Sequence, residues 1–233
     1  MFKFLDAEWK DLIMVNYEVD ADLLVSRLPR GTDIDLEDGK CFVSLVGFMF
    51  LNTRVLTIPV PFHINFEEVN LRFYVKRKVG DEVRRGVCFV KEIVPRWAIA
   101  TVARVFYGEP YECWTMAHRR TLSEVSYSWT KAANANEMRI RLGASLGVPE
   151  AGSHGEFIIE HYWGYTSRSG GRVDEYKVEH PKWELFEAAE PQINVDFGAV
   201  YGEEFAFLSD AKPYSVLLAK GSKISVFKGQ RIK

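Results

Sequence analysis

The sequence predicts a mostly β protein, folded as a closed antiparallel barrel or cone with a few short helices. Alternation of apolar and polar residues dominates the chain, and it places the two kinds of side chain on opposite faces of an extended strand. Residues that favour turns, above all Gly and Asp, recur between the alternating segments. Closure is the expected arrangement for many short antiparallel strands, because it leaves no long edge unpaired.

The alternation is clearest in four segments, which we expect to be half-buried strands. They are residues 15–20, 69–76, 138–142 and 224–226. Four expected turns lie at residues 37–39, 79–81, 169–171 and 220–222.

Only two segments are predicted to be helical. Asp20 is a suitable N-cap for a short helix over residues 21–28. Pro95 suits the first turn of a second helix, which continues through residues 97–106.

Length and composition indicate one soluble globular domain over residues 1–233. The chain is 47% hydrophobic and 27% charged, and a boundary within residues 143–155, where Gly, Ser and Pro cluster, is the alternative. The formal net charge of -2 provides no field for nucleic acid or an anionic membrane, so we expect neither as a partner. Three scattered cysteines without a CxxC pair favour reduced thiols, and we expect a cytoplasmic protein.

The usual signatures of nucleotide-driven, zinc-protease and nucleophile-elbow enzymes do not occur in the sequence. The best cluster for a metal is Glu160, His161 and His180. If Glu160 and His161 are neighbours in a strand, however, their side chains point to opposite faces and do not readily share one ion. We therefore expect no metal and no cofactor.

The densest polar stretch lies in residues 66–75. If Val69 and Leu71 face one side of a strand, then Glu68, Asn70, Arg72 and Tyr74 line the other side. A small cone could enclose this stripe. The alternative is a solvated sheet face with cross-strand ion pairs.

Arg104 lies in an otherwise apolar helical stretch. Burial of a guanidinium without a partner costs several kcal/mol, so a carboxylate should meet it, and Glu68 is the candidate. The alternative is an arginine whose charged end reaches the helix surface.

The order of several short motifs resembles that of a known family. The motifs are VNYEVD at 15–20, FEEVNLR at 66–72, GVCF at 86–89, EHY at 160–162, HPKW at 180–183 and PYSV at 213–216. Over nearly its whole length the chain resembles the DUF2071 or YqjF-like family, a distant relative of acetoacetate decarboxylase.

This resemblance implies a β-cone, the fold of decarboxylases whose buried lysine forms a Schiff base with a β-keto acid. Residues 103–110 match the frame that leads to the two lysines of those enzymes, and the lysines fall on Tyr111 and Glu112. The carboxylate of the decarboxylases corresponds to Glu68, and an arginine of theirs is replaced by Glu18.

A phenol or a carboxylate cannot condense with a ketone, so the loss of the lysine predicts a protein without Schiff-base decarboxylase activity. Lys91, in the apolar run 87–94, is the one substitute amine to be tested. The alternative is an amine at the solvent face of a strand.

We thus expect a cone whose interior is lined by Glu68, Arg72, Arg104 and Tyr111 and closed by His161. It would bind a small polar molecule with a carboxylate or carbonyl group, with Arg104 holding the acid and Tyr111 donating a hydrogen bond. Glu68 and Tyr111 could then exchange protons beside a carbonyl, in an enolisation, lyase or hydratase reaction on a keto or hydroxy acid.

Two further interpretations stay open. One is a non-catalytic ligand sensor, or a homo-oligomer that acts through its contacts. The other is a collapsed cavity whose polar residues are structural pairs.

Overall fold

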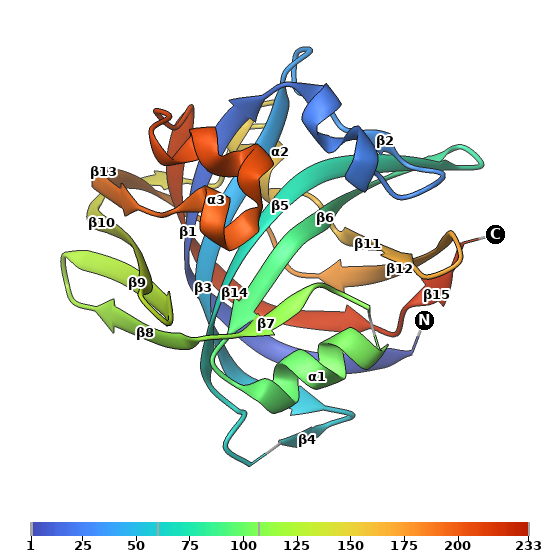
Figure 1. The fold of residues 1–233 in the computed structure, drawn as a ribbon, viewed down its shortest axis with the longest axis horizontal. Coiled ribbons are helices and arrows are strands. Elements are labelled where there is room, and N and C mark those ends of the chain that lie inside the picture. Colours follow the sequence, from blue (N-terminus) through green and yellow to red (C-terminus); the bar gives the residue numbers. More distant parts are fainter. Residues whose placement is uncertain (1, 60, 107, 233) are drawn as a thin grey trace.

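The computed structural model describes residues 2–59, 61–106 and 108–232, and for residues 102–106 it describes the backbone only. Strands make up most of this part of the chain (Figure 1). In chain order they are β1 (Lys3–Val19), β2 (Asp33–Ile34), β3 (Cys41–Val55), β4 (Ile58–Pro59), β5 (Phe66–Val79), β6 (Glu82–Val94), β7 (Tyr111–Cys113), β8 (Thr115–Arg120), β9 (Glu124–Lys131), β10 (Asn134–Gly147), β11 (Trp163–Arg168), β12 (Arg172–Glu179), β13 (Leu185–Asn194), β14 (Ser215–Phe227) and β15 (Gln230–Arg231). The α-helices are α1 (Trp97–Phe106), α2 (His154–Ile159) and α3 (Phe197–Tyr201), and the 3₁₀ helices are η1 (Ala21–Arg27) and η2 (Glu203–Ser209).

Seven strands form a ring. β1, β3, β5, β6, β11, β12 and β14 pair in that order, and β14 pairs back with β1. The pairs are antiparallel except β6–β11, which is parallel and joins Trp163 to Gly86 and Gly164 to Val87. The fold is therefore mostly β, as the sequence predicts, but one contact of the ring is parallel rather than antiparallel.

A second layer continues from one strand of the ring. β13 pairs with β14, and β10, β9 and β8 follow in order, so that β8 and β9 reach away from the ring (Figure 1). The helices α3 and η2 bring apolar side chains to the outer face of the ring strands, where the rings of Phe197 and Tyr17 lie 5.5 Å apart. The outer face of these strands is thus covered rather than solvated.

This covering gives the molecule two apolar cores. Along β3, Val43 and Leu45 belong to the outer core, whereas Phe42 and Val46 belong to the core inside the ring. The expected strand positions are confirmed, but the expectation of half-buried strands is wrong for residues 15–19 of β1 and for β5. Even the polar Asn16, which alternates with apolar neighbours in β1, is fully buried.

Both expected helices are present. Asp20 caps η1 by accepting a hydrogen bond from the backbone N–H of Asp22 at 2.9 Å, although the helix is 3₁₀ rather than α. The expectation of only two helical segments is wrong, because α2, α3 and η2 are also helical. Segments of five to seven residues are too short to show a 3.6-residue period.

One expected turn is absent. Gly221 lies inside β14, opposite Lys10 of β1, and not between two strands. It has φ of +78°, and a Cβ atom there would lie 2.0 Å from the carbonyl oxygen of Trp9. Glycine is required at this position by the close approach of β1, not by a turn.

Within the described residues, no helix has both the length and the apolar character needed to cross a membrane.

Candidate functional site

The polar stripe of β5 faces the inside of the ring. Val69 and Leu71 belong to the outer core, and the alternate residues Glu68, Asn70 and Arg72 line a cavity. The sequence prediction that these side chains share one face of the strand is therefore confirmed, and the face is enclosed rather than solvated. Period-two alternation was sufficient for this part of the site.

The cavity has a volume of about 220 Å³, and every strand of the ring contributes to its wall. Most of the wall is apolar. Its polar members include Thr53, His63, Glu68, Asn70, Arg72, Glu92, Glu109, Tyr111, His161, Tyr176 and His180. The space exceeds that of a cavity of about 150 Å³ known to accommodate benzene in another protein, so a small metabolite fits.

Glu68 and Tyr111 are in direct contact. The Tyr111 hydroxyl donates a hydrogen bond to Glu68 Oε2 at 2.9 Å, and the Asn70 amide donates one to Glu68 Oε1 at 3.0 Å. Burial raises the pKa of Glu68 to about 7, against the two hydrogen bonds, which lower it. Burial, together with the nearby Glu68 and Glu92 carboxylates, also raises the pKa of Tyr111 well above its usual value.

Two further buried carboxyls lie near this pair, and neither is among the site residues predicted from the sequence. Tyr111 lies opposite Glu92 because the short β7 pairs with β6 in parallel. Burial raises the pKa of Glu92 well above its usual value, and the charges of Glu109 and Glu68 raise it further. Burial also raises the pKa of Glu109 to about 7, although a hydrogen bond from the Thr166 hydroxyl opposes the shift.

A sequence signal was present for Glu92. It is a carboxylate inside the apolar run of residues 87–94, where an unpaired charge is costly. Glu109 gave no such signal, because its neighbours Gly108 and Pro110 are typical of an exposed loop.

His161 lies on the cavity wall with its side chain 1% exposed. Its Nε2 lies 3.2 Å from Asp35 Oδ2, and Asp35 also accepts a hydrogen bond of 2.6 Å from Arg85 Nε. Burial lowers the pKa of His161 to about 4, more than Asp35 raises it, so the imidazole is neutral at pH 7. Burial also acts to raise the pKa of Asp35, but its hydrogen bonds to His161 and Arg85 outweigh burial and hold that pKa below its usual range.

The neutral ring fixes the proton positions of His161. Because ionised Asp35 only accepts, Nε2 carries the proton and Nδ1 is an acceptor. Nδ1 is buried and has no hydrogen-bond partner among the described residues.

Unpaired polar atoms are concentrated on this cavity. Ten buried side-chain atoms of the described chain have no hydrogen-bond partner, and six belong to residues that line the cavity. The six are Trp9 Nε1, Thr53 Oγ1, Asn70 Oδ1, Arg72 Nε, Glu92 Oε2 and His161 Nδ1.

The predicted contact between Arg104 and Glu68 falls outside the described part of the chain. The backbone of Arg104 belongs to α1, and its side chain is among those not described. Arg72 is the guanidinium that the structure places at the cavity, where its Nη2 donates a hydrogen bond of 3.2 Å to the carbonyl oxygen of Ile158.

The candidate metal cluster is not assembled. Glu160 and His161 follow α2 and do not lie in a strand, which corrects the geometry assumed from the sequence. Glu160 accepts a hydrogen bond from Tyr162, and His180 stacks on Trp183 with ring centroids 4.0 Å apart. Among the residues that the structure describes, no group of three His, Cys, Asp or Glu side chains is arranged to hold a metal ion.

The comparison with protein families settles the family. The model of DUF2071, described as an uncharacterized conserved protein, matches residues 6–223. The chain belongs to this family. It is also 26% identical over 219 residues to the uncharacterized protein YqjF of Bacillus subtilis (strain 168), a match that covers 90% of this chain and 88% of that protein.

Solved structures with the same fold include an acetoacetate decarboxylase from Legionella pneumophila. It superposes with a TM-score of 0.73 at 11% sequence identity and covers 100% of this chain and 88% of its own. The enduracididine biosynthesis enzyme MppR, solved in complex with pyruvate, superposes with a TM-score of 0.70 at 13% identity, covering 100% of this chain and 91% of its own. The DUF2071 chain therefore has an acetoacetate-decarboxylase-like fold.

Lys91 does not face the cavity of this DUF2071 chain. Its amine lies 2.8 Å from Glu112 Oε1 and donates a hydrogen bond of 2.5 Å to the carbonyl oxygen of Val200. No lysine among the described residues lines the cavity. The alternative was an amine at the solvent face of a strand, and the structure gives Lys91 a side chain that is 22% exposed and paired with Glu112.

Proposed function

We propose that the cavity binds a small organic molecule with a carboxylate or carbonyl group, and that Glu68 and Tyr111 exchange protons with it. The unpaired polar atoms on the cavity wall carry this proposal. A buried polar atom without a partner costs about 1–3 kcal/mol. A ligand that supplies partners to several of the six atoms would recover part of that free energy.

The two kinds of unpaired atom indicate the ligand. Arg72 Nε carries a proton and suits a carboxylate, whereas His161 Nδ1 is an acceptor and suits a hydroxyl group. A small hydroxy acid, or the enol form of a keto acid, carries both groups. MppR, which has the same fold, was solved with the keto acid pyruvate, and this supports the ligand class.

The charge of the wall also favours an acid. Three carboxyls in one cavity would repel an anion if all were ionised, but the pKa values of Glu68, Glu92 and Glu109 are all raised by burial. Protonated carboxyls donate hydrogen bonds to a ligand oxygen, and Arg72 supplies the positive charge. We therefore expect binding to weaken above about pH 7, where Glu68 and Glu109 lose their protons.

The chemistry proposed for Glu68 and Tyr111 is proton transfer beside a carbonyl. A carboxyl with a pKa of about 7 can both accept and release a proton near neutral pH. Its hydrogen bond to Tyr111 leaves the phenol in position to stabilise a developing enolate oxygen. An enolisation, lyase or hydratase reaction would use these two groups; the choice of reaction class is an analogy at the level of the fold.

We further propose that the protein is not a Schiff-base decarboxylase. By resemblance to the family, Tyr111 occupies the position of the decarboxylase lysine, and Lys91 is paired with Glu112 outside the cavity. Incubation with acetoacetate followed by borohydride should give no adduct detectable by mass spectrometry. A covalent adduct on Lys91, or on any other lysine, would overturn this part of the proposal.

Thermal unfolding in the presence of small acids tests binding. At a concentration about 100 times its Kd, a ligand stabilises the folded protein by about 2.7 kcal/mol, which for a domain of this size raises Tm by about 5–10 °C. We expect such a shift with at least one small keto or hydroxy acid. Arg72→Gln should abolish it, and Arg141→Gln, which changes an exposed arginine paired with Glu190, should retain it. No shift with any acid of a broad set would contradict the proposal.

Exchange of the ligand's α-hydrogen for deuterium in heavy water, followed by NMR, separates an enzyme from a sensor. Proton transfer by Glu68 and Tyr111 predicts exchange that Tyr111→Phe slows. Binding without exchange would support the non-catalytic sensor.

A further inference from the structure

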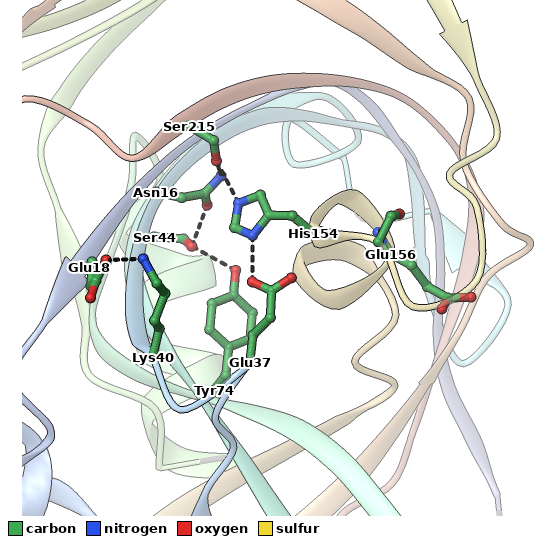
Figure 2. Close-up of polar contacts among 10 residues, drawn as sticks. Asn16, Glu18, Glu37, Lys40, Ser44, Tyr74, His154, Glu156 and Ser215 are labelled. Carbon is green, nitrogen blue, oxygen red and sulfur yellow. Dashed lines mark hydrogen bonds and ion pairs between the residues drawn. The ribbon is translucent and has the colours of Figure 1, made fainter.

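A second cluster of reactive side chains lies apart from the cavity. Figure 2 shows His154, the first residue of α2, between Glu37 from the turn before β3 and Ser215 at the start of β14. His154 Nε2 lies 2.7 Å from Ser215 Oγ, and His154 Nδ1 lies 2.5 Å from Glu37 Oε2. None of the three residues lines the cavity. We propose that they form a Ser–His–Glu catalytic site in which Ser215 is the nucleophile for acyl transfer from esters.

The hydrogen bonds fix the direction of proton transfer. Ionised Glu37 can only accept, so His154 Nδ1 carries the proton and Nε2 of the neutral ring is an acceptor. The Ser215 hydroxyl therefore donates to His154 Nε2. This is the arrangement in which an imidazole acts as general base to a serine and a carboxylate holds the correct tautomer.

A chain of buried groups holds Ser215 in place (Figure 2). The Asn16 amide nitrogen donates to Ser215 Oγ at 2.8 Å, and Asn16 Oδ1 accepts from Ser44 Oγ at 2.6 Å. Ser44 Oγ lies 2.6 Å from the Tyr74 hydroxyl. Because Ser44 uses its proton on Asn16, Tyr74 is the donor in this last contact. Each contact in this series therefore has one donor and one acceptor.

The site can be reached from solvent. The side chains of His154 and Glu37 are 22% and 16% exposed, and Ser215 is partly buried. The Tyr214 ring, half exposed, lies 5.1 Å from the His154 ring, centroid to centroid. Phe42 packs against the Tyr214 ring, with centroids 5.0 Å apart, and Lys40 Nζ lies over the ring at 4.6 Å from its centroid. The remaining exposed part of the ring offers an apolar surface beside His154, so the expected substrates are esters with an apolar acyl chain.

The proposed reaction has two steps. Ser215 Oγ attacks the ester carbonyl carbon and forms an Oγ–C bond, while its proton passes to His154 Nε2. The ester C–O bond then breaks, and the proton leaves with the alcohol. Water next attacks the acyl carbon and gives a proton to His154 Nε2. The bond between Ser215 Oγ and the acyl carbon then breaks, His154 returns the proton to Ser215 Oγ, and the carboxylic acid leaves.

Labelling of the wild-type protein with a fluorophosphonate, with the modified residue located by peptide mass spectrometry, tests the proposal without any variant. We expect modification at Ser215. We also expect hydrolysis of p-nitrophenyl butyrate, and His154→Gln should slow both reactions by about 100-fold. Thermal unfolding of the variant shows whether it is folded.

Ser145 provides a matched control, because its hydroxyl pairs with the Glu184 carboxylate without an imidazole. Ser145→Ala should leave labelling and hydrolysis unchanged, whereas Ser215→Ala should remove both. Labelling of wild-type Ser215 no faster than that of Ser145, or a folded His154→Gln variant that reacts at the wild-type rate, would show that the cluster is only structural and overturn the proposal.

Discussion

At the scale of single residues, the unusual property of this molecule is a set of buried carboxyls whose pKa values are raised by folding. Glu68, Glu92 and Glu109 are each 4% exposed or less. The charges of Glu68 and Glu109 raise the pKa of Glu92, and the charge of Glu68 raises that of Glu109, so the three cannot all be charged at low cost. Their proton state therefore links the stability of the protein to pH.

Glu68 gives this link a direction that can be measured. Its pKa rises from the ordinary 4.5 to about 7 on folding. Between these values the unfolded chain has released the proton that the folded protein still holds, so the free energy of unfolding falls as pH rises, by about 3 kcal/mol at most. Glu68→Gln should flatten this slope in urea unfolding measured from pH 5 to pH 7.5.

Glu109 contributes a slope of the same sign, so the variant should retain part of the pH dependence. Glu190→Gln, at a carboxylate 65% exposed, is the matched control and should unfold with the wild-type slope. An unchanged slope in Glu68→Gln would mean that Glu68 is ionised in the folded protein.

Tyr111→Phe tests the central hydrogen bond. The variant keeps the ring but leaves Glu68 Oε2 without its donor, so we expect destabilisation by about 1–3 kcal/mol at pH 6. Tyr162→Phe removes a hydroxyl that donates to Glu160 in a partly exposed pair and should cost less than about 1 kcal/mol. If urea unfolding showed the same loss of unfolding free energy in both variants, the buried Tyr111–Glu68 hydrogen bond would contribute no more to stability than the partly exposed one.

At the scale of elements, the sequence predicts strands with a repeated apolar–polar alternation, but it does not predict helices of only a few residues. The alternation in β5 was sufficient to place Glu68, Asn70 and Arg72 on one face. The six-residue α2 was missed, although Ser153 and Glu156 form a capping pair that could have indicated its start. The sequence predicts a turn at Gly221, because a glycine required by a neighbouring strand looks the same in one sequence as a glycine required by a turn.

Gly221→Ala tests this account of β14. The variant has to place a Cβ atom against the Trp9 carbonyl and keep a positive φ, so we expect a loss of about 2 kcal/mol or more. Gly80→Ala is the matched control, since Gly80 also has a positive φ (+61°) but has nothing within 4 Å of the added atom. It should lose only about 1 kcal/mol. Equal losses in urea unfolding would show that backbone conformation alone explains the glycine.

At the scale of the whole molecule, closure of the ring creates the site. Glu68 comes from β5, Tyr111 from β7 and His161 from the segment after α2, and the ring brings them to one cavity. The alternation of residues predicts the face of β5 that lines the cavity, and the family resemblance predicts that Tyr111 belongs to the site. They could not place Glu109 or the Asp35–His161 pair, because those contacts depend on pairing between distant strands.

The most direct test of the central claim is a crystal structure of the protein grown with a saturating concentration of pyruvate or lactate. We expect electron density for the acid inside the ring, with a carboxylate oxygen within hydrogen-bond distance of Arg72 Nε. For lactate, we also expect the hydroxyl group within hydrogen-bond distance of His161 Nδ1. Crystals grown at acid concentrations that saturate any binding seen in solution could instead show a cavity filled only with water or closed by rearranged side chains. Either result would contradict the proposal that the cavity binds a small acid.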